Sequence, residues 1–252
     1  MTTIRNLVSC LALVISCLRA SSQPVAFQST DRQTALLELF TSEGCSSCPS
    51  AETWLGRLKE SPGLWKEFVP VAFHVDYCDY LGWRDPWGSK DLSERQRAHA
   101  ASWNRDSIYT PGFVLNGKEW RDWSRLKDGP KPAASQPGVL TVSSADRIHW
   151  RVSFAPTNRS DHRYEAHAAL LASGLTSDIK AGENRGRRLN HDFVVLALAE
   201  SSLTTEADKA TGELSLAAAK KGQASQLAIA VWVTSQGHLE PLQAAGGWLP
   251  KP

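Results

Sequence analysis

Two cysteines three positions apart, Cys45 and Cys48, are the residues of this 252-residue chain whose type and spacing best suit chemistry. They stand in the stretch LFTSEGCSSCPSAE, residues 39–52, with a proline directly behind the second cysteine. Such a pair can cycle between dithiol and disulfide, hold a soft metal ion, or staple an exported domain. Which of the three roles applies depends on the sequence around the pair.

The chain begins with a segment that has the composition of an export signal. Residues 7–18 form an apolar run too short to span a bilayer, and residues 20–22 offer a small-residue cleavage site, so residues 1–22 are predicted to be a signal peptide. A second interpretation makes residues 14–17 a lipobox, with a lipid anchor on Cys17. Both place the mature chain outside the cytoplasm, in the periplasm or secreted, where disulfides persist.

Charge and composition restrict the partners. The signal segment holds two arginines and no acidic residue, so the remaining chain has 26 basic and 26 acidic side chains. This balance argues against a nucleic-acid partner, which would require clustered lysine and arginine. No later stretch of the sequence has the pattern of a membrane span. Three cysteines follow the signal, Cys45, Cys48 and Cys78, so at least one thiol is left out of an intramolecular pair.

Up to about residue 123 the pattern alternates between strands and helices. The predicted strands are residues 35–41, 69–75 and 111–115, and the predicted helices are residues 49–58 and 92–103, the second capped by Asp91. Asn116-Gly117, directly after the third strand, is the strongest two-residue hairpin signal. A β-α-β unit followed by a hairpin indicates an α/β layer with a mixed sheet.

The pattern changes after residues 128–138, a stretch rich in proline and glycine that is typical of a linker. Short strand candidates follow at residues 139–142, 148–154, 164–171, 193–198, 214–217 and 227–233. That spacing predicts an antiparallel β-sandwich of six or seven strands, although Ala218 and Ala219 would also extend a short helix. The basic stretch 180–191 is interpreted as a solvated loop, with a contact surface for the first domain or a partner as the alternative.

The position of the cysteine pair suits a reactive thiol. Cys45 and Cys48 follow a buried strand and lie at the start of a predicted helix, whose unpaired N–H groups and partial positive charge stabilise a thiolate. Cys45 is the more exposed of the two and is the natural nucleophile, while Cys48 lies one turn further in. Pro49 fits an early helical position, where its missing N–H has the smallest effect.

The segments ALLELFTSEGCSSC, VPVAFHVD and IYTPGFVLNG, in that order, resemble the strand, C-x-x-C helix, second strand and cis-proline hairpin of the thioredoxin superfamily. The longer pattern HVDYCDYLGWRDPW, SERQ and YTPGFVLNG is similar to a bacterial exported family of unknown function. The resemblance implies an α/β thioredoxin-like domain, a mixed sheet with flanking helices, over residues 30–127, with an aromatic-rich insertion at about 77–108. An all-β sandwich-like domain would follow at residues 139–252.

The resemblance also assigns roles to individual residues. Cys45 would attack a substrate disulfide and Cys48 would resolve the mixed disulfide. The chain would then be a thiol–disulfide oxidoreductase-like protein that acts on a protein thiol or disulfide and needs no cofactor. Thr110 and Pro111 would share a cis peptide bond beside the cysteines, where the proline hinders metal capture.

The sequence departs from the superfamily around the cysteines. Leu39 stands where an aspartate usually serves proton transfer, and Glu43 is a nearer substitute in the loop. Gly44 replaces the usual tryptophan, and the two middle residues, Ser46 and Ser47, lack the proline or histidine that tunes the redox potential in well-known members. These departures concern proton handling and redox potential.

Cys78 and Asp76 follow the second predicted strand, at the sheet edge where Cys45 follows the first. Cys78 is a free half-buried thiol, a third redox thiol or a third metal ligand, and Asp76 is interpreted as a loop cap rather than a catalytic acid. Two other functions stay open. Cys45, Cys48, Cys78 and His74 would make a Cu(I)- or Zn-handling module, and a permanent Cys45–Cys48 disulfide would leave a non-enzymatic binding module.

Overall fold

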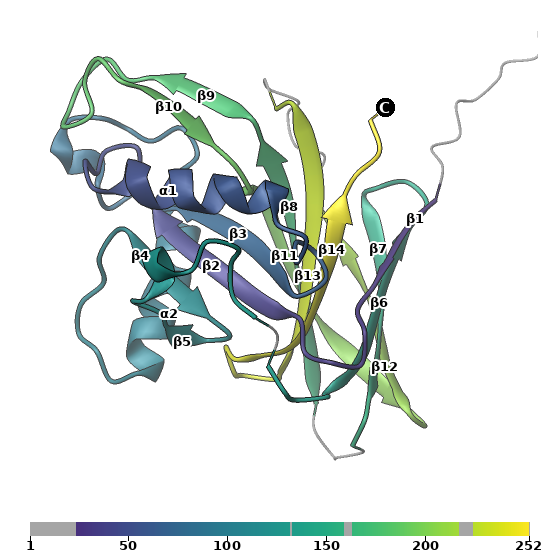
Figure 1. The fold of residues 1–252 in the computed structure, drawn as a ribbon. Coiled ribbons are helices and arrows are strands. Elements are labelled where there is room, and N and C mark those ends of the chain that lie inside the picture. The colour runs from purple at the N-terminus through teal and green to yellow at the C-terminus, as the bar shows by residue number, and fades with distance from the viewer. Residues whose placement is uncertain (1–23, 132, 159–162, 217–223, 252) are drawn as a thin grey trace, which may run out of the picture.

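Residues 24–131, 133–158, 163–216 and 224–251 are described by the computed structural model of the protein, and they are mostly β-structure (Figure 1). The two α-helices in these ranges are α1 (Cys48–Arg57) and α2 (Lys90–Ser102). The strands are β1 (Val25–Gln28), β2 (Ala35–Thr41), β3 (Phe68–His74), β4 (Gly112–Leu115), β5 (Lys118–Glu119), β6 (Gly138–Ser144), β7 (His149–Pro156), β8 (Tyr164–Ser173), β9 (Leu175–Asp178), β10 (Arg188–His191), β11 (Val194–Glu206), β12 (Lys209–Ser215), β13 (Gln226–Ser235) and β14 (Pro241–Trp248).

The predictions for the export signal, for Cys17 and for Ala218 and Ala219 fall outside the described residues. Within the described ranges, neither helix has the length and apolar character needed to cross a membrane.

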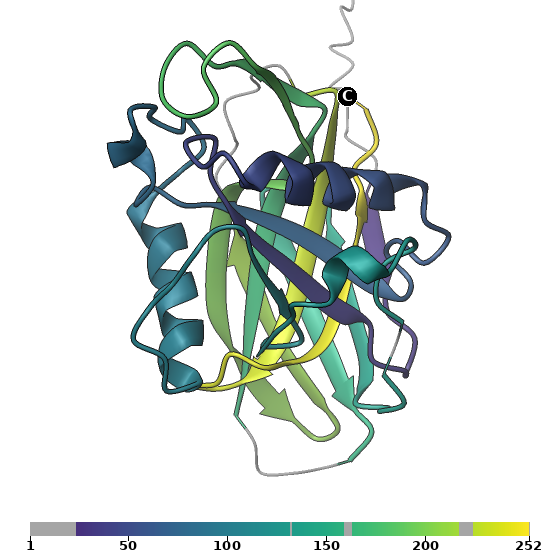
Figure 2. The same cartoon turned by 60° about the vertical axis from the view of Figure 1, so that its left-hand side comes forward.

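The part of the sheet that carries the cysteines has β2 at its centre. β3 pairs with β2 in parallel, and β4 pairs with it antiparallel on the other side. Every residue of β2 and β3 is buried, because α1 packs Trp54 and Leu55 against these strands and β13 packs Trp232 into the same core. Figure 2 shows the α1 ribbon beside these two strands. The predicted hairpin is confirmed: Asn116 and Gly117 both have positive φ and join β4 to β5.

Both predicted helices are present, with small differences at their starts. α1 begins at Cys48, so Pro49 takes the second helical position. α2 begins at Lys90, and its cap is Ser89 rather than the predicted Asp91. The Ser89 hydroxyl accepts a hydrogen bond from the Leu92 N–H at 3.4 Å, as an N-cap side chain does.

The predicted fold class, a helix-flanked thioredoxin-like domain followed by a separate β-sandwich, is wrong. β11 is the reason. Its first residue, Val194, lies opposite Ala72 and extends the sheet as a parallel neighbour of β3. On its other side the strand pairs with β8 over residues 194–203, and residues 204–206 pair with β12. One mixed sheet of 12 strands therefore runs through both halves of the chain. The local pattern marks a strand here, but it carries no information on the partner of that strand.

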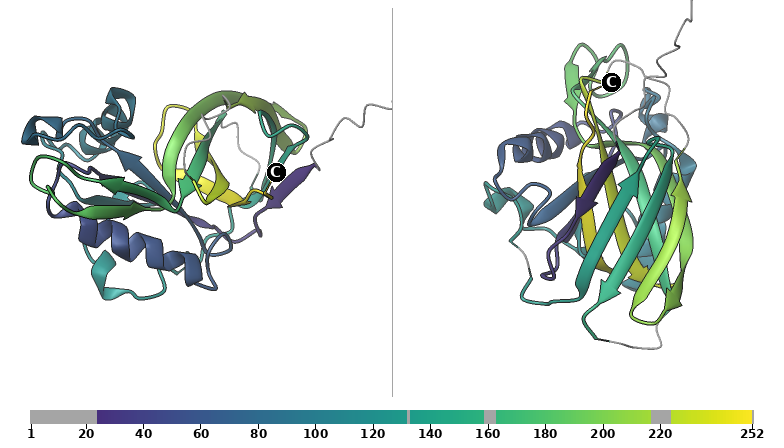
Figure 3. Two further views of the ribbon diagram at one scale, coloured as in Figure 1. Left: turned by 90° about the horizontal axis from the view of Figure 1, so that it is seen from above. Right: turned by 90° about the vertical axis from the view of Figure 1, so that its right-hand side faces the viewer.

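The C-terminal strands curl around a core of their own (Figure 3). β13 separates this core from the one around the cysteines. Ile229, Val231 and Val233 face the C-terminal core, and Ala230 and Trp232 face the other one, because successive side chains of a strand point to opposite sides. The β-rich character predicted for this half is confirmed, while β1, β9, β10 and β14 were not predicted.

Gly138 at the start of β6 offers a test of how closely the first two C-terminal strands approach. Its φ is +123°, and an added Cβ would lie 2.1 Å from the Ala155 carbonyl oxygen on β7. We expect Gly138→Ala to lower the free energy of unfolding by about 3 kcal/mol, because neither backbone can move away freely.

Gly186 provides the matched control for this prediction. It also has a positive φ, +82°, but no atom lies within 4 Å of its added Cβ. Gly186→Ala should therefore lower the free energy of unfolding by only about 1 kcal/mol. Urea unfolding of both variants measures the difference, and equal losses would contradict the close approach of β6 and β7.

Candidate functional site

The cysteine pair lies where β2 ends and α1 begins. Cys45 is in the turn between them, and Cys48 is the first residue of the helix. Cys45 keeps 9% of its surface exposed, whereas Cys48 is fully buried. Both are free thiols, as is Cys78. The two thiols of the pair therefore differ in access, since Cys45 keeps a small exposed surface and Cys48 keeps none.

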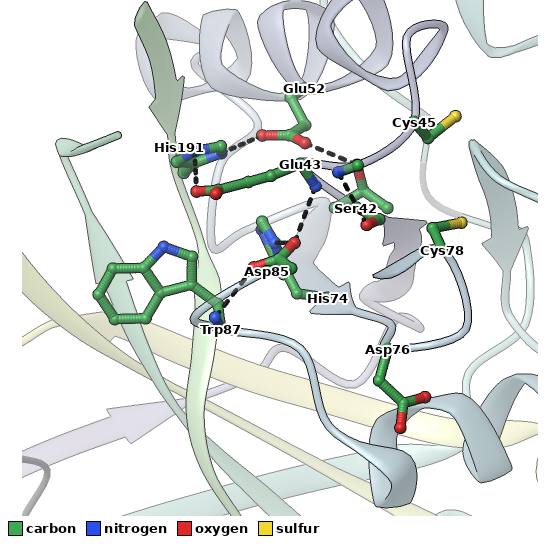
Figure 4. A network of polar contacts seen from close by, with 12 residues as sticks. Ser42, Glu43, Cys45, Glu52, His74, Asp76, Cys78, Asp85, Trp87 and His191 are labelled. Carbon is green, nitrogen blue, oxygen red and sulfur yellow. Dashed lines mark hydrogen bonds and ion pairs between the residues drawn. The ribbon is translucent and has the colours of Figure 1, made fainter. Parts of the chain in front are cut away.

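Thr110 connects the cysteine turn with Cys78. The Thr110–Pro111 peptide bond is cis. The Thr110 carbonyl oxygen lies 3.7 Å from the Cys45 sulfur, and the Thr110 hydroxyl lies 3.4 Å from the Cys78 sulfur. Figure 4 shows both thiols on the same side of the site. The structure thus brings together four predicted residues: Cys45, Cys78, Thr110 and Pro111.

The surroundings of the three thiols make them unequal acids. The hydrogen bond from the Cys48 thiol, with bonds from Ser47 and Thr110, outweighs burial and lowers the pKa of Cys45 to about 5. Burial, together with its bond to Cys45 and the charge there, raises the pKa of Cys48 far above its ordinary value. Burial also raises the pKa of Cys78. At neutral pH Cys45 is a thiolate and the other two residues are protonated.

The basic stretch between β9 and β10 closes over the cysteine turn. Asn184 is fully buried, and its side-chain amide donates to the carbonyl oxygens of Glu43 at 2.8 Å and Cys45 at 3.0 Å. Glu183 accepts a hydrogen bond from the Ser46 N–H at 3.0 Å. The alternative interpretation of this stretch, a contact surface for the N-terminal segment, is confirmed. The Asn184 amide gives hydrogen-bond partners to two carbonyl groups that would otherwise be buried without one.

Behind the cysteine turn lies a buried cluster of three carboxylates and two imidazoles (Figure 4). His191 on β10 lies between two of the carboxylates: its Nδ1 is hydrogen-bonded to Glu52, and its Nε2 lies 3.0 Å from Glu43 Oε1. The contact with Glu43 is an ion pair and not a hydrogen bond. The Thr41 hydroxyl donates to the other oxygen of Glu52 at 2.6 Å.

His74 and Asp85 form the other half of the cluster. Nδ1 of His74 lies 2.7 Å from Oδ2 of Asp85. Asp85 also accepts hydrogen bonds from the backbone N–H groups of Glu43 at 2.8 Å and Trp87 at 2.9 Å. The imidazole rings of His74 and His191 meet edge to face, with centroids 5.2 Å apart. The cluster therefore joins α1, β3, β10 and the loop before α2.

Charge pairing outweighs burial for four groups of this cluster: Glu52, His74, Asp85 and His191. Burial by itself lowers the pKa of His191, but its contacts with Glu43 and Glu52 raise it to about 10. Burial raises the pKa of Glu52, and its bond and charge contact with His191 reverse this and lower it. In the same way, the mutual attraction of His74 and Asp85 overcomes burial, raising the pKa of His74 and lowering that of Asp85.

Three predicted site residues point away from the thiols in Figure 4. Glu43, considered as a substitute for the missing aspartate, faces His191. His74 lies against a carboxylate of the buried cluster and not beside the cysteines. Asp76 accepts a hydrogen bond from the Ser93 hydroxyl on α2 at 2.6 Å, which is the contact of a loop cap.

Three residues of the buried cluster were missed by the sequence reasoning: Glu52, Asp85 and His191. Glu52 had a local signal. It stands four residues after Cys48, on the helix face that also buries Leu55, and an acidic residue on a buried face needs a partner. Asp85 and His191 lie in a loop and a short strand whose positions depend on distant contacts, so their types and spacing gave no such signal.

Comparisons with known proteins concern the family and the fold. The family model described as "Protein of unknown function (DUF1223)" matches residues 36–234. The crystal structure of protein AGR_C_4864 from Agrobacterium tumefaciens is similar with a TM-score of 0.59 and 22% identity, covering 88% of this chain and 96% of that one. HBP35 of Porphyromonas gingivalis is similar with a TM-score of 0.56 and 13% identity, covering 88% and 76%. No curated protein gives a significant match.

Proposed function

We propose that this chain, which belongs to the DUF1223 family of proteins of unknown function, carries out thiol–disulfide exchange with protein partners outside the cytoplasm. The observation that supports this most strongly is the contrast within the cysteine pair. Cys45 keeps 9% of its surface exposed and has a pKa lowered to about 5, whereas Cys48 has no exposed surface and is protonated. Exchange requires a thiolate that can reach the partner and a second thiol that later resolves the mixed disulfide.

The proposed reaction moves two electrons between the pair and a partner. The Cys45 thiolate attacks one sulfur of a partner disulfide, that S–S bond breaks, and a mixed disulfide forms while the other partner sulfur leaves as a thiolate. Cys48 then attacks the Cys45 sulfur and releases the second partner sulfur. The Cys48 proton goes to this second sulfur, and the first sulfur, which left as a thiolate, takes a proton from water, so the partner gains two thiols and the chain gains a Cys45–Cys48 disulfide. The reverse sequence oxidises a partner dithiol.

The environment of Cys45 favours the oxidising direction. Hydrogen bonds from Cys48, Ser47 and Thr110 stabilise the thiolate, which exists only in the reduced pair. Stabilising the reduced form makes the disulfide form a stronger oxidant. We therefore propose protein dithiols as the substrate class, with a separate oxidant of the disulfide or quinone class restoring the Cys45–Cys48 disulfide.

The pH dependence of Cys45 alkylation tests the thiolate directly. The rate of reaction with iodoacetamide should rise with a midpoint near pH 5 and be flat above about pH 7, because only the thiolate reacts. The titratable groups that interact with Cys45 are the thiols of Cys48 and Cys78 and the Tyr77 hydroxyl, and the Glu183 carboxylate accepts from the N–H of the adjacent Ser46. Peptide mass spectrometry of the reduced chain gives the rate for each cysteine separately.

Cys78 is the control within the same molecule. Its raised pKa should keep its alkylation slow below about pH 9. A Cys45 midpoint near the ordinary value of about 8.5 would remove the observation on which the proposed function depends.

A further inference from the structure

The buried cluster behind the cysteine turn contains the donor set of a metal site. One oxygen of Glu52 and one nitrogen each of His74 and His191 lie within 4.8 Å of one another. All three residues are buried, and they come from α1, β3 and β10. Two imidazoles and one carboxylate are ligands that suit Zn²⁺ and related divalent ions.

Each of these three side chains also has an outer partner. Nδ1 of His74 is held by Asp85, which leaves Nε2 for a ligand. The Nε2 atom of His191 lies against Glu43, which leaves Nδ1 on the side of Glu52. Metal-binding histidines have this arrangement, in which the second ring nitrogen is fixed by a carboxylate. The Glu52 oxygen that does not contact His191 also has a partner, since it accepts a hydrogen bond from the Thr41 hydroxyl.

Two further observations point to an occupant. Nε2 of His74 is fully buried and has no hydrogen-bond partner among the described residues, although a buried polar atom normally has one. The cluster also gathers three carboxylates, one negative charge more than its two imidazoles can balance even when both rings are protonated. A divalent cation would supply both the partner and the charge.

The cluster has a route to the surface. Glu52 keeps 7% of its surface exposed and lines a cleft between α1 and β10, together with Pro49, Gly56, Arg187, Leu189 and Asn190. Glu52 is the one residue of the cluster that lines this cleft, which also has the basic side chains of Arg57, Lys59, Arg187 and Arg188. The ion would take the place where Glu52 and His191 are now hydrogen-bonded. We infer that Glu52, His74 and His191 bind one divalent transition-metal ion of the Zn²⁺ class, separately from the cysteine pair.

X-ray absorption of the wild-type chain loaded with one equivalent of Zn²⁺ tests the ligands without any substitution. The expected first shell contains nitrogen and oxygen at about 2.0–2.1 Å and no sulfur at about 2.3 Å. A sulfur shell would overturn the inference, because it would place the ion on Cys45, Cys48 and Cys78. Failure to bind Zn²⁺ in equilibrium dialysis would also overturn it and leave the cluster as an ion-pair network.

Substitutions then assign the ion to named residues. Asp85→Asn removes the carboxylate behind His74 and should weaken Zn²⁺ binding about 10–100-fold, and Glu52→Gln should weaken it at least as much. His149→Gln is the control, because His149 pairs with Asp146 on the exposed surface and should leave binding unchanged. A chain with all three cysteines changed to serine should bind as the wild type does. Loss of binding in that chain would overturn the inference.

Discussion

Cys45→Ser is expected to slow thiol–disulfide exchange by more than about a thousandfold, because a serine hydroxyl is not ionised at neutral pH and cannot replace the Cys45 thiolate. Cys48→Ser should behave differently. Cys45 would still attack the partner, but no second thiol would release it, so a mixed disulfide should accumulate. Insulin reduction measures the rate, and non-reducing electrophoresis with mass spectrometry detects the trapped adduct.

Cys78→Ser is the matched control for these two variants. Cys78 lies at the same sheet edge as Cys45, contacts the same threonine, and has a raised pKa. Its replacement should leave the exchange rate nearly unchanged. An equal loss in Cys78→Ser and Cys45→Ser would contradict the assignment of Cys45 as the nucleophile, as would wild-type exchange by Cys45→Ser.

Arg95→Ala is expected to lower the free energy of unfolding by about 3–5 kcal/mol. Arg95 on α2 donates to Glu38 on β2 at 2.6 Å, and Glu38 is fully buried. Burial raises the pKa of Glu38, but the charges of Arg95 and His99 outweigh it and lower the pKa to about 2. Removing Arg95 therefore leaves a buried carboxylate with one of its two charge partners missing.

The Arg95 guanidinium has a second role in packing. It lies 5.2 Å from the ring centre of Phe73 on β3 and 5.0 Å from that of Trp232 on β13, so it also joins the two halves of the chain. Arg97 on the same helix is the control, since it pairs with Glu94 where both side chains are about half exposed. Arg97→Ala should lower the free energy of unfolding by less than about 1 kcal/mol. Urea unfolding compares them, and equal effects would contradict the importance of the buried pair.

Local elements around the cysteines could be predicted from the sequence with good accuracy. β2 has the predicted bounds, residues 35–41, because a short apolar run between polar segments leaves few alternatives. The hairpin at Asn116-Gly117 formed as predicted, since few other dipeptides accept two positive φ values. Cys45, Thr110 and Cys78 meet because the ends of neighbouring strands share one edge of the sheet.

The arrangement of the strands and the buried cluster could not be predicted in this way. β11 was recognised as a strand, but its pairing with β3, β8 and β12 depends on segments distant in the sequence. The sequence of β13 is a continuous apolar run without polar alternation, because both faces of the strand are buried, each in a different core. His191 was assigned to a solvated loop, since nothing near it in the sequence indicates the two glutamates that it meets.

The reduction potential of the Cys45–Cys48 pair is the most direct test of the proposed function. Equilibration of the chain with glutathione buffers of graded potential, followed by thiol labelling, gives the value. Exchange with protein thiols requires a potential between about −120 and −270 mV, and the stabilised Cys45 thiolate predicts a value toward the less negative end. A potential below about −300 mV would contradict the account, because disulfides in that range are structural and do not turn over.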